Sequence, residues 1–372
     1  MNIYFDNAAS TPLESEVIEV MYETSKNIFG NPSASHSFGR KSKAAIEKAR
    51  KTIAKYLNCS PLEIIFTSGG TESNNMVLQT AINKYDIKNI IISEIEHKCV
   101  LNTAKEIAKL KNIQLHILKV NNLGQISFSE LESILIKCEG KKLVSLMHSN
   151  NEIGTLLDLE KTLTICNKNN AFFHSDTVQT MAHYTFDLKS LGIHFVSGSA
   201  HKFHGPKGVG FLYMKQDSKL EPLIFGGGQE RSYRSGTENL VSIVGLEKAF
   251  ELAHMNMKER KAHILEIKNY LKNRLIEEID DITFNGDQEN SLYTILSVSF
   301  PQKFVSDMFM FNLDIKGIAC SGGSACASGA STGSYVLEAI DQPINRQTLR
   351  FSFSHNNTKK EVDYLIKVLK EF

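Results

Sequence analysis

The sequence predicts an α/β protein that consists of a large domain with a mostly parallel sheet and a smaller α+β domain. Short apolar runs alternate with helical patterns along the first part of the chain, which is typical of parallel strands between helices. From about residue 242 this rhythm changes to a long charged helical pattern followed by strands. A chain of 372 residues, 42% of them hydrophobic, is also long enough for more than one domain.

The large domain is expected to span residues 14–245 and to contain the parallel sheet. Its buried strands are predicted where apolar residues follow one another in short runs. These runs are residues 89–93, 115–120, 143–149, 171–176 and 194–200. Helical patterns lie between the strands, for example at 102–112 and 159–170, as a parallel sheet requires.

The small domain is expected to combine residues 246–372 with the N-terminal residues 1–13. A long charged helix is predicted at about 245–280, and strands at 293–300 and 348–354. Thr358 and Glu361 have the spacing of a capping box, so a last helix should begin there.

Composition and charge exclude several classes of function. Lys and Arg number 42 and Asp and Glu 41, so the net charge of +1 gives no sign of binding to nucleic acid or to an anionic membrane. No apolar run approaches the 18 residues of a membrane span, and the N-terminus lacks the layout of a secretory signal. We therefore expect a cytoplasmic protein whose 6 cysteines are reduced.

Lys202 occupies the most informative stretch, "SGSAHKFHGPKGVG" at 197–210. It directly follows an expected strand, and ligands of α/β proteins bind at the carboxyl ends of strands. Small polar neighbours there could hold a phosphate while the amine forms a Schiff base. The stretch makes pyridoxal phosphate one candidate cofactor, although a lone lysine in a loop is more often a solvated charge.

A second candidate feature is the turn Ser68-Gly69-Gly70-Thr71, which joins an apolar strand to a helix that begins near Glu72. Backbone N–H groups at a helix N-terminus form an anion site when glycine allows close approach. The lysine and glycine spacing of a Walker loop is absent. Taken alone, the turn is equally well explained as an ordinary connection between strand and helix.

Asp176, Gln179 and Asn151 are polar residues at expected strand ends. A buried carboxylate such as Asp176 needs a cationic partner, and a protonated pyridine nitrogen would be one. A structural hydrogen-bond network is the alternative explanation for Asp176. Gln179 follows three residues later and could reach the same ring, whereas Asn151 lies in an otherwise unremarkable turn.

The segment "CSGGSACASGAS" at 320–331 places Cys320 and Cys326 among glycine, serine and alanine. A buried structural cysteine does not need such neighbours. We interpret Cys320 as a core residue at a strand end and Cys326 as a chemically active thiol.

These features in this order resemble the cysteine desulfurases of the NifS/IscS type, in the class V aminotransferase-like branch of pyridoxal phosphate enzymes. The resemblance covers nearly the whole chain. Its motifs are "YFDNAAST" (4–11), "GNPSASH" (30–36), "FTSGGTESNN" (66–75), "EHKCVL" (96–101), "NNEIG" (150–154), "HSDTVQ" (174–179), "SAHKFHGPKGVG" (199–210), "GGGQERSYRSGTEN" (226–239), "SGGSACASG" (321–329) and "LRFSFS" (349–354).

The resemblance implies fold type I of the pyridoxal phosphate-dependent transferases, with a seven-stranded sheet, and it implies a reaction. Lys202 would hold the cofactor and move the Cα proton, and His97 would stack on the ring and handle protons. Cys326 would attack the sulfur of L-cysteine, which gives L-alanine and a persulfide that passes to an acceptor. Acceptors of this family serve iron–sulfur cluster assembly or tRNA thiolation.

The resemblance also implies the binding residues. Arg350 and Asn151 would bind the substrate carboxylate, and Thr237 would reach the cofactor phosphate of the neighbouring subunit in a homodimer. The cofactor-binding set would be Gly70, Thr71, His97, Asn151, Asp176, Gln179, Ser199, His201, Lys202 and Thr237.

No resident metal is expected, although Cys326 could act as a transient iron–sulfur ligand. A metal-binding role for His97, His201 and His204 has the weakest case, because cofactor contacts would occupy them. A selenocysteine lyase or another class V aminotransferase-like enzyme would share Lys202 and Asp176, but an aminotransferase would not need Cys326. A scaffold without activity, recognisable because it would be colourless, is the alternative of a different class.

Overall fold

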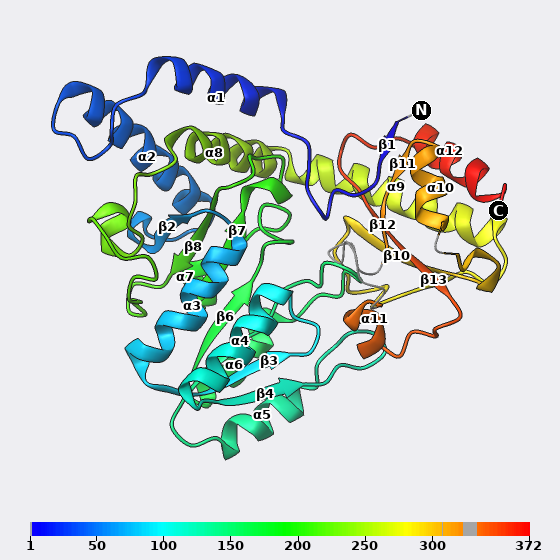
Figure 1. Ribbon diagram of the computed structural model, residues 1–372, viewed down its shortest axis with the longest axis horizontal. Helices are drawn as coiled ribbons and strands as arrows, with labels where there is room; N and C mark the ends of the chain where they lie inside the picture. The colour runs from blue at the N-terminus through cyan, green and yellow to red at the C-terminus, as the bar shows by residue number, and fades with distance from the viewer. Residues whose placement is uncertain (1, 307, 323–332) are drawn as a thin grey trace.

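The computed structural model describes residues 2–306, 308–322 and 333–372, and it confirms the α/β fold class (Figure 1). The large sheet has seven strands in the order β2-β8-β7-β6-β5-β3-β4. Only β8 runs antiparallel to its neighbours, so the sheet is mostly parallel. The strands are β2 (Ile64–Thr67), β8 (Gly210–Met214), β7 (Phe195–Ser199), β6 (Ala171–Asp176), β5 (Lys141–Ser145), β3 (Ile87–Ser93) and β4 (Gln114–Leu118).

Helices cover both faces of this sheet, because the side chains of each strand alternate between two apolar cores. In β3, Ile90 and Ile92 belong to the core under α3 and α4, whereas Ile91 belongs to the opposite core. The first core is closed by α3 (Gly70–Tyr85) and α4 (Lys98–Lys111), and the second by α2 (Ser37–Tyr56), α5 (Phe128–Lys137), α6 (Leu159–Lys168), α7 (Leu188–Leu191) and α8 (Leu240–Met255), with α1 (Ser15–Asn27) packed on α8.

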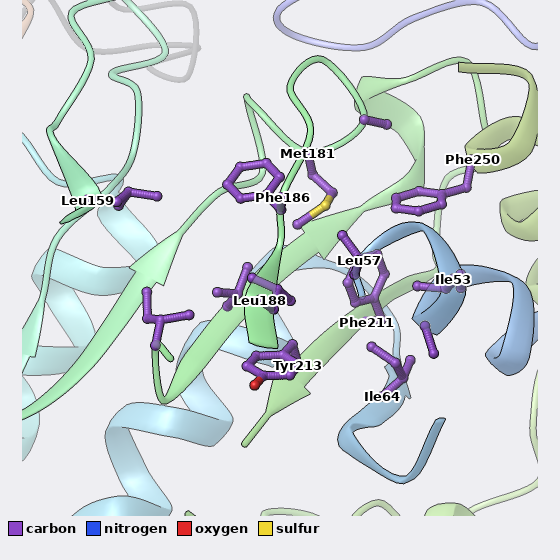
Figure 2. Close-up of a cluster of buried hydrophobic side chains, with 14 of the residues drawn as sticks. Ile53, Leu57, Ile64, Leu159, Met181, Phe186, Leu188, Phe211, Tyr213 and Phe250 are labelled. Atoms are coloured by element: carbon purple, nitrogen blue, oxygen red, sulfur yellow. The ribbon is translucent and has the colours of Figure 1, made fainter. Parts of the chain in front are cut away.

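Aromatic side chains fill the second core near β8 (Figure 2). Phe211 and Tyr213 of β8 share this cluster with Ile53 of α2, with Leu57 directly after α2 and with Phe250 of α8. Burial of such a side chain contributes about 1.5–3 kcal/mol relative to exposure, so this core fixes α2 and α8 against the sheet.

The smaller part contains the sheet β12-β13-β10-β9 and the short parallel pair β1-β11. Phe5 belongs to its core together with residues from α9, β10 and α12, so the N-terminus packs here as expected. On these separate cores we propose the domain division given above. The elements are β1 (Ile3–Tyr4), α9 (Met257–Glu278), β9 (Thr283–Phe284), β10 (Ile295–Phe300), α10 (Phe309–Ile315), β11 (Ile318–Ala319), β12 (Ser321–Gly322), α11 (Tyr335–Ala339), β13 (Gln347–Ser352) and α12 (Lys359–Leu369).

The structure confirms the predicted strands but corrects the long helix at 245–280. That segment contains two helices, α8 and α9, which meet at Asn256 with φ −103° and ψ 8°. The Asn256 side chain donates to the Leu252 carbonyl and so competes with a continuous helix. The capping box of Thr358 and Glu361 is present as predicted. Among helices of the described ranges, none has both the length and the apolarity to cross a bilayer.

Candidate active site

One cavity of about 560 Å³ collects most of the predicted site residues. It lies at the carboxyl ends of β6 and β7, where α/β sheets bind ligands. The N-terminal segment contributes Asp6, Ala8 and Ala9 to its wall. The predicted residues that line it are Gly70, Thr71, His97, Asn151, Asp176, Gln179, Ser199, His201, Lys202 and Arg350.

Asp176 ends β6 and is 7% exposed. Its Oδ2 accepts from Asn74 Nδ2 at 2.7 Å, and its Oδ1 accepts from the Val178 backbone N–H at 2.9 Å. These donors hold the carboxylate in one orientation at the cavity wall. The carboxylate has no cationic partner among these contacts, so it is available to a cation bound in the cavity.

Lys202 ends the short 3₁₀ turn Ala200–Lys202 that follows β7. Its Nζ donates to the Ala8 carbonyl at 2.5 Å and to the Ala9 carbonyl at 3.0 Å. The Gln179 side chain donates to the same Ala8 carbonyl at 3.0 Å. The N-terminal segment therefore positions the amine.

The turn before α3 forms an open anion site. Gly69 is the N-cap residue with φ 149°, a conformation that favours glycine, and no side chain caps the helix. Gly70 and Thr71 in the first turn line the cavity beside Ser199. Because the first N–H groups of a helix have no partner within it, this turn can bind a phosphate.

His97 is the N-cap residue of α4, and its Nδ1 accepts from the Cys99 backbone N–H at 3.2 Å. The Cys99 Sγ lies 2.9 Å from the same nitrogen. An Nδ1 that accepts a hydrogen bond leaves the ring proton on Nε2. Burial lowers the pKa of His97, so the ring is neutral near pH 7.

Arg350 lies on β13 and is 5% exposed. Its Nη1 donates to the Asn151 carbonyl at 2.8 Å, and its Nη2 donates to Asp6 Oδ1 at 2.7 Å. The Nε atom is buried and has no hydrogen-bond partner among the described residues. A buried guanidinium N–H without a partner is unfavourable, so this donor favours an additional acceptor group close to it.

Two predicted residues are not placed in the cavity. Thr237 is exposed and is absent from the described residues of the cavity wall. Cys326 lies outside the described residues. Gly322 and Gly333, the described residues on either side of 323–332, both line the cavity.

His204 lies in a different cluster, with Glu14 and His355, whose ligand atoms are within 4.8 Å of one another. Arg260 Nη2 lies 2.9 Å from Glu14 Oε1 and already supplies a positive charge to this carboxylate. A metal ion would have to compete with that guanidinium, so we interpret the cluster as an ion-pair network.

Sequence reasoning missed the roles of Asp6, Ala8, Ala9, Asn74 and Cys99. All of them lie within motifs quoted above, but the bonds of Ala8 and Ala9 use backbone carbonyls, which have no signature in the sequence. The available signal was the motif "YFDNAAST" itself, because polar residues at the edge of a predicted domain boundary can face a site between domains.

Comparison with known proteins extends over the whole chain. The family model described as aminotransferase class-V matches residues 3–365. The cysteine desulfurase IscS of Dictyoglomus turgidum is 40% identical over 371 residues, which are 99% of this chain and 93% of that protein. A solved NifS-like protein superposes with a TM-score of 0.92 at 36% identity and covers 100% of this chain and 99% of its own. A structure described as SspA in complex with cysteine has a TM-score of 0.83 at 33% identity and covers 96% and 100%.

Proposed function

This chain belongs to the aminotransferase class-V family, and from that premise we propose that it is a pyridoxal phosphate-dependent cysteine desulfurase. The observation that best supports the activity is the joint position of three groups in one cavity. These groups are the Lys202 amine, the Asp176 carboxylate and the Arg350 guanidinium. Relatives named as cysteine desulfurases and a neighbour solved with cysteine agree with this proposal.

The residues of the cavity fit pyridoxal phosphate. The uncapped turn at Gly70 and Thr71, with Ser199 and His201 nearby, would hold the phosphate. Asp176 would pair with the pyridinium nitrogen, and Lys202 would bind the aldehyde carbon. When bound, this cofactor supplies an electron sink for the electron pair left on the substrate Cα.

The chain's own residues supply orientation and proton transfer. Arg350 lines the cavity and binds the substrate carboxylate through its guanidinium, and Asn151 holds the guanidinium by its backbone carbonyl. Lys202 Nζ takes the Cα proton, and the neutral ring of His97 presents Nε2–H to the cavity. Gln179 donates to the same Ala8 carbonyl as Lys202 and would contact the ring oxygen.

Cys326 performs the sulfur transfer in this proposal. Its thiolate attacks the sulfur of L-cysteine, so an S–S bond forms as the Cβ–S bond breaks. The electron pair of the broken bond remains with the carbon skeleton, which takes up one proton at Cβ, regains the Cα proton from Lys202 and leaves as L-alanine. Cys326 then holds a persulfide for a sulfur acceptor of iron–sulfur assembly or tRNA thiolation.

A homodimer completes the site in this proposal. Thr237 is exposed, and it follows a segment in which Glu230, Arg231 and Ser232 have φ angles of 44°, 55° and 66°. The buried Arg50–Glu230 ion pair fixes this unusual backbone. The segment can therefore present Thr237 to the cofactor phosphate in a neighbouring subunit.

Mass spectrometry tests the proposal directly. The purified protein, supplied with pyridoxal phosphate, is incubated with L-cysteine, and the peptide that contains Cys326 is analysed. We expect a gain of one sulfur atom together with formation of alanine, and neither in Cys326→Ala or Lys202→Ala. Cofactor binding without added sulfur and without alanine would refute the proposed activity.

A further inference from the structure

Arg350 shares its positive charge with a carboxylate of the chain itself. Asp6 Oδ1 lies 2.7 Å from Arg350 Nη2, and the two side chains are 20% and 6% exposed. The backbone carbonyl of Asn151 takes a hydrogen from Nη1. Of the guanidinium donors, the buried Nε is left without a partner among the described residues.

Asp6 is held in place from several directions. Its backbone forms a parallel bridge with Ser352, two residues after Arg350 on the same chain. The Ser321 hydroxyl donates to the same Asp6 Oδ1 at 2.6 Å, and Ser321 lies opposite Arg350 in the β12–β13 ladder. A carboxylate fixed in this way can hold the guanidinium in one rotamer at the wall of the cavity.

The other charges around the cavity indicate how many carboxylates a substrate can carry when it binds beside Asp6 and Arg350. Glu152 and Glu338 line the cavity together with Asp6 and Arg350. Arg350 is the one arginine among the described lining residues. Of the two lysines in this wall, Lys202 has a role toward the cofactor, as does Asp176, and Lys98 lies near Glu152, whose negative charge it offsets. The arginine can therefore neutralise a single substrate carboxylate, while a second carboxylate would meet the negative charge of Asp6.

We propose that Asp6 is a positioning and specificity-determining residue, which orients Arg350 toward the α-carboxylate and excludes amino acids with a second carboxylate. This inference rests on the proposed function, because it takes Arg350 as the carboxylate-binding group. It concerns substrate choice, so it can fail while the desulfurase activity stands.

The test uses L-asparagine and L-aspartate, which have nearly the same shape and differ in one negative charge. Their dissociation constants are measured by titration calorimetry on the cofactor-loaded protein. For the wild type we expect L-aspartate to bind at least about tenfold more weakly than L-asparagine. In Asp6→Asn, which keeps the acceptor oxygen and removes the charge, the ratio should fall to about threefold or less.

Ser321→Ala is the matched control, since it removes a hydrogen bond to the same oxygen and leaves the charge of Asp6. Ser321→Ala should keep the wild-type ratio of the L-aspartate to the L-asparagine dissociation constant, and Asp6→Glu should keep most of that difference. An Asp6→Asn ratio equal to that of the wild type would overturn the proposal. If Asp6→Asn does not fold, equal binding of the two ligands to the wild type would overturn it as well.

The proposed activity is read separately from the sulfur gained by Cys326. A normal persulfide with an unchanged Asp6→Asn ratio would refute only the role of Asp6. A changed ratio without any persulfide would refute the activity and leave the role of Asp6 in carboxylate selection.

Discussion

Replacement of Glu230 by alanine should be among the most destabilising single changes in the large domain. Glu230 Oε1 and Oε2 accept from Arg50 Nη2 and Nη1 at 2.7 and 2.8 Å, with both side chains 3% exposed or less. The Phe66 backbone N–H also donates to Glu230 at 2.7 Å. The variant would therefore leave a buried guanidinium with only the partly exposed Glu47 as counter-charge, 3.1 Å from Arg50 Nε, and a buried N–H without its acceptor.

Loss of one partner of a buried ion pair costs about 3–5 kcal/mol, and the orphaned N–H adds about 1–3 kcal/mol. The three residues that begin at Glu230 have a left-handed backbone, and each such conformation costs about 1–3 kcal/mol. Relaxation of this segment in the variant would therefore offset part of the lost stability. We therefore expect Glu230→Ala to lower the unfolding free energy by about 4 kcal/mol. The relaxed segment should also weaken cofactor binding, because Thr237 would no longer be presented to the partner.

Guanidinium denaturation followed by circular dichroism measures the effect, with the shift in midpoint converted at a common slope. The control is Lys88→Ala, which removes an ion pair with side chains 58% and 80% exposed and should cost about 0.5 kcal/mol or less. A loss below about 1 kcal/mol in Glu230→Ala would show that the pair does not hold this segment. Unchanged cofactor affinity in a destabilised variant would refute the link to Thr237.

Further predictions concern a glycine, a thiol and a buried acid. Gly210→Ala should weaken cofactor binding at least about tenfold, because the added Cβ would lie 2.7 Å from the Gly69 Cα and displace the phosphate-binding turn. Fluorescence titration of the cofactor measures this affinity, and an unaltered affinity would contradict the prediction. The Cys320 side chain is half-buried, and desolvation raises its pKa to about 12, so peptide mass spectrometry should find slower alkylation by iodoacetamide in the native protein at pH 8 than after unfolding. Burial also raises the pKa of Glu96 from 4.5 to about 8, so folding favours the protonated form; the stabilisation is complete below pH 4.5 and is lost as the pH rises through about 8. Glu96→Gln should flatten the fall in unfolding free energy between pH 6 and pH 9, and an equally steep fall in the variant would argue against Glu96 as its source.

Local patterns in the sequence were enough to predict the strands of the large sheet, the last helix and most of the residues that line the cavity. Strand prediction succeeded because buried parallel strands are short apolar runs, and β3, β5 and β6 are such runs. The capping box at Thr358 was equally local. Lys202 and Asp176 were found because they follow strands, where parallel strand ends meet in space.

The assembly of the site depends on contacts between distant parts of the chain. The bonds from Lys202 to Ala8 and from Arg350 to Asp6 join residues 194 and 344 positions apart, and packing of the N-terminus into the small core brings them together. The break at Asn256 depended on one side chain competing with the backbone for a carbonyl. The local sequence pattern predicts which residues form a strand or a helix. It does not predict which distant residue will bond to a given carboxylate or carbonyl, because that depends on how the chain folds.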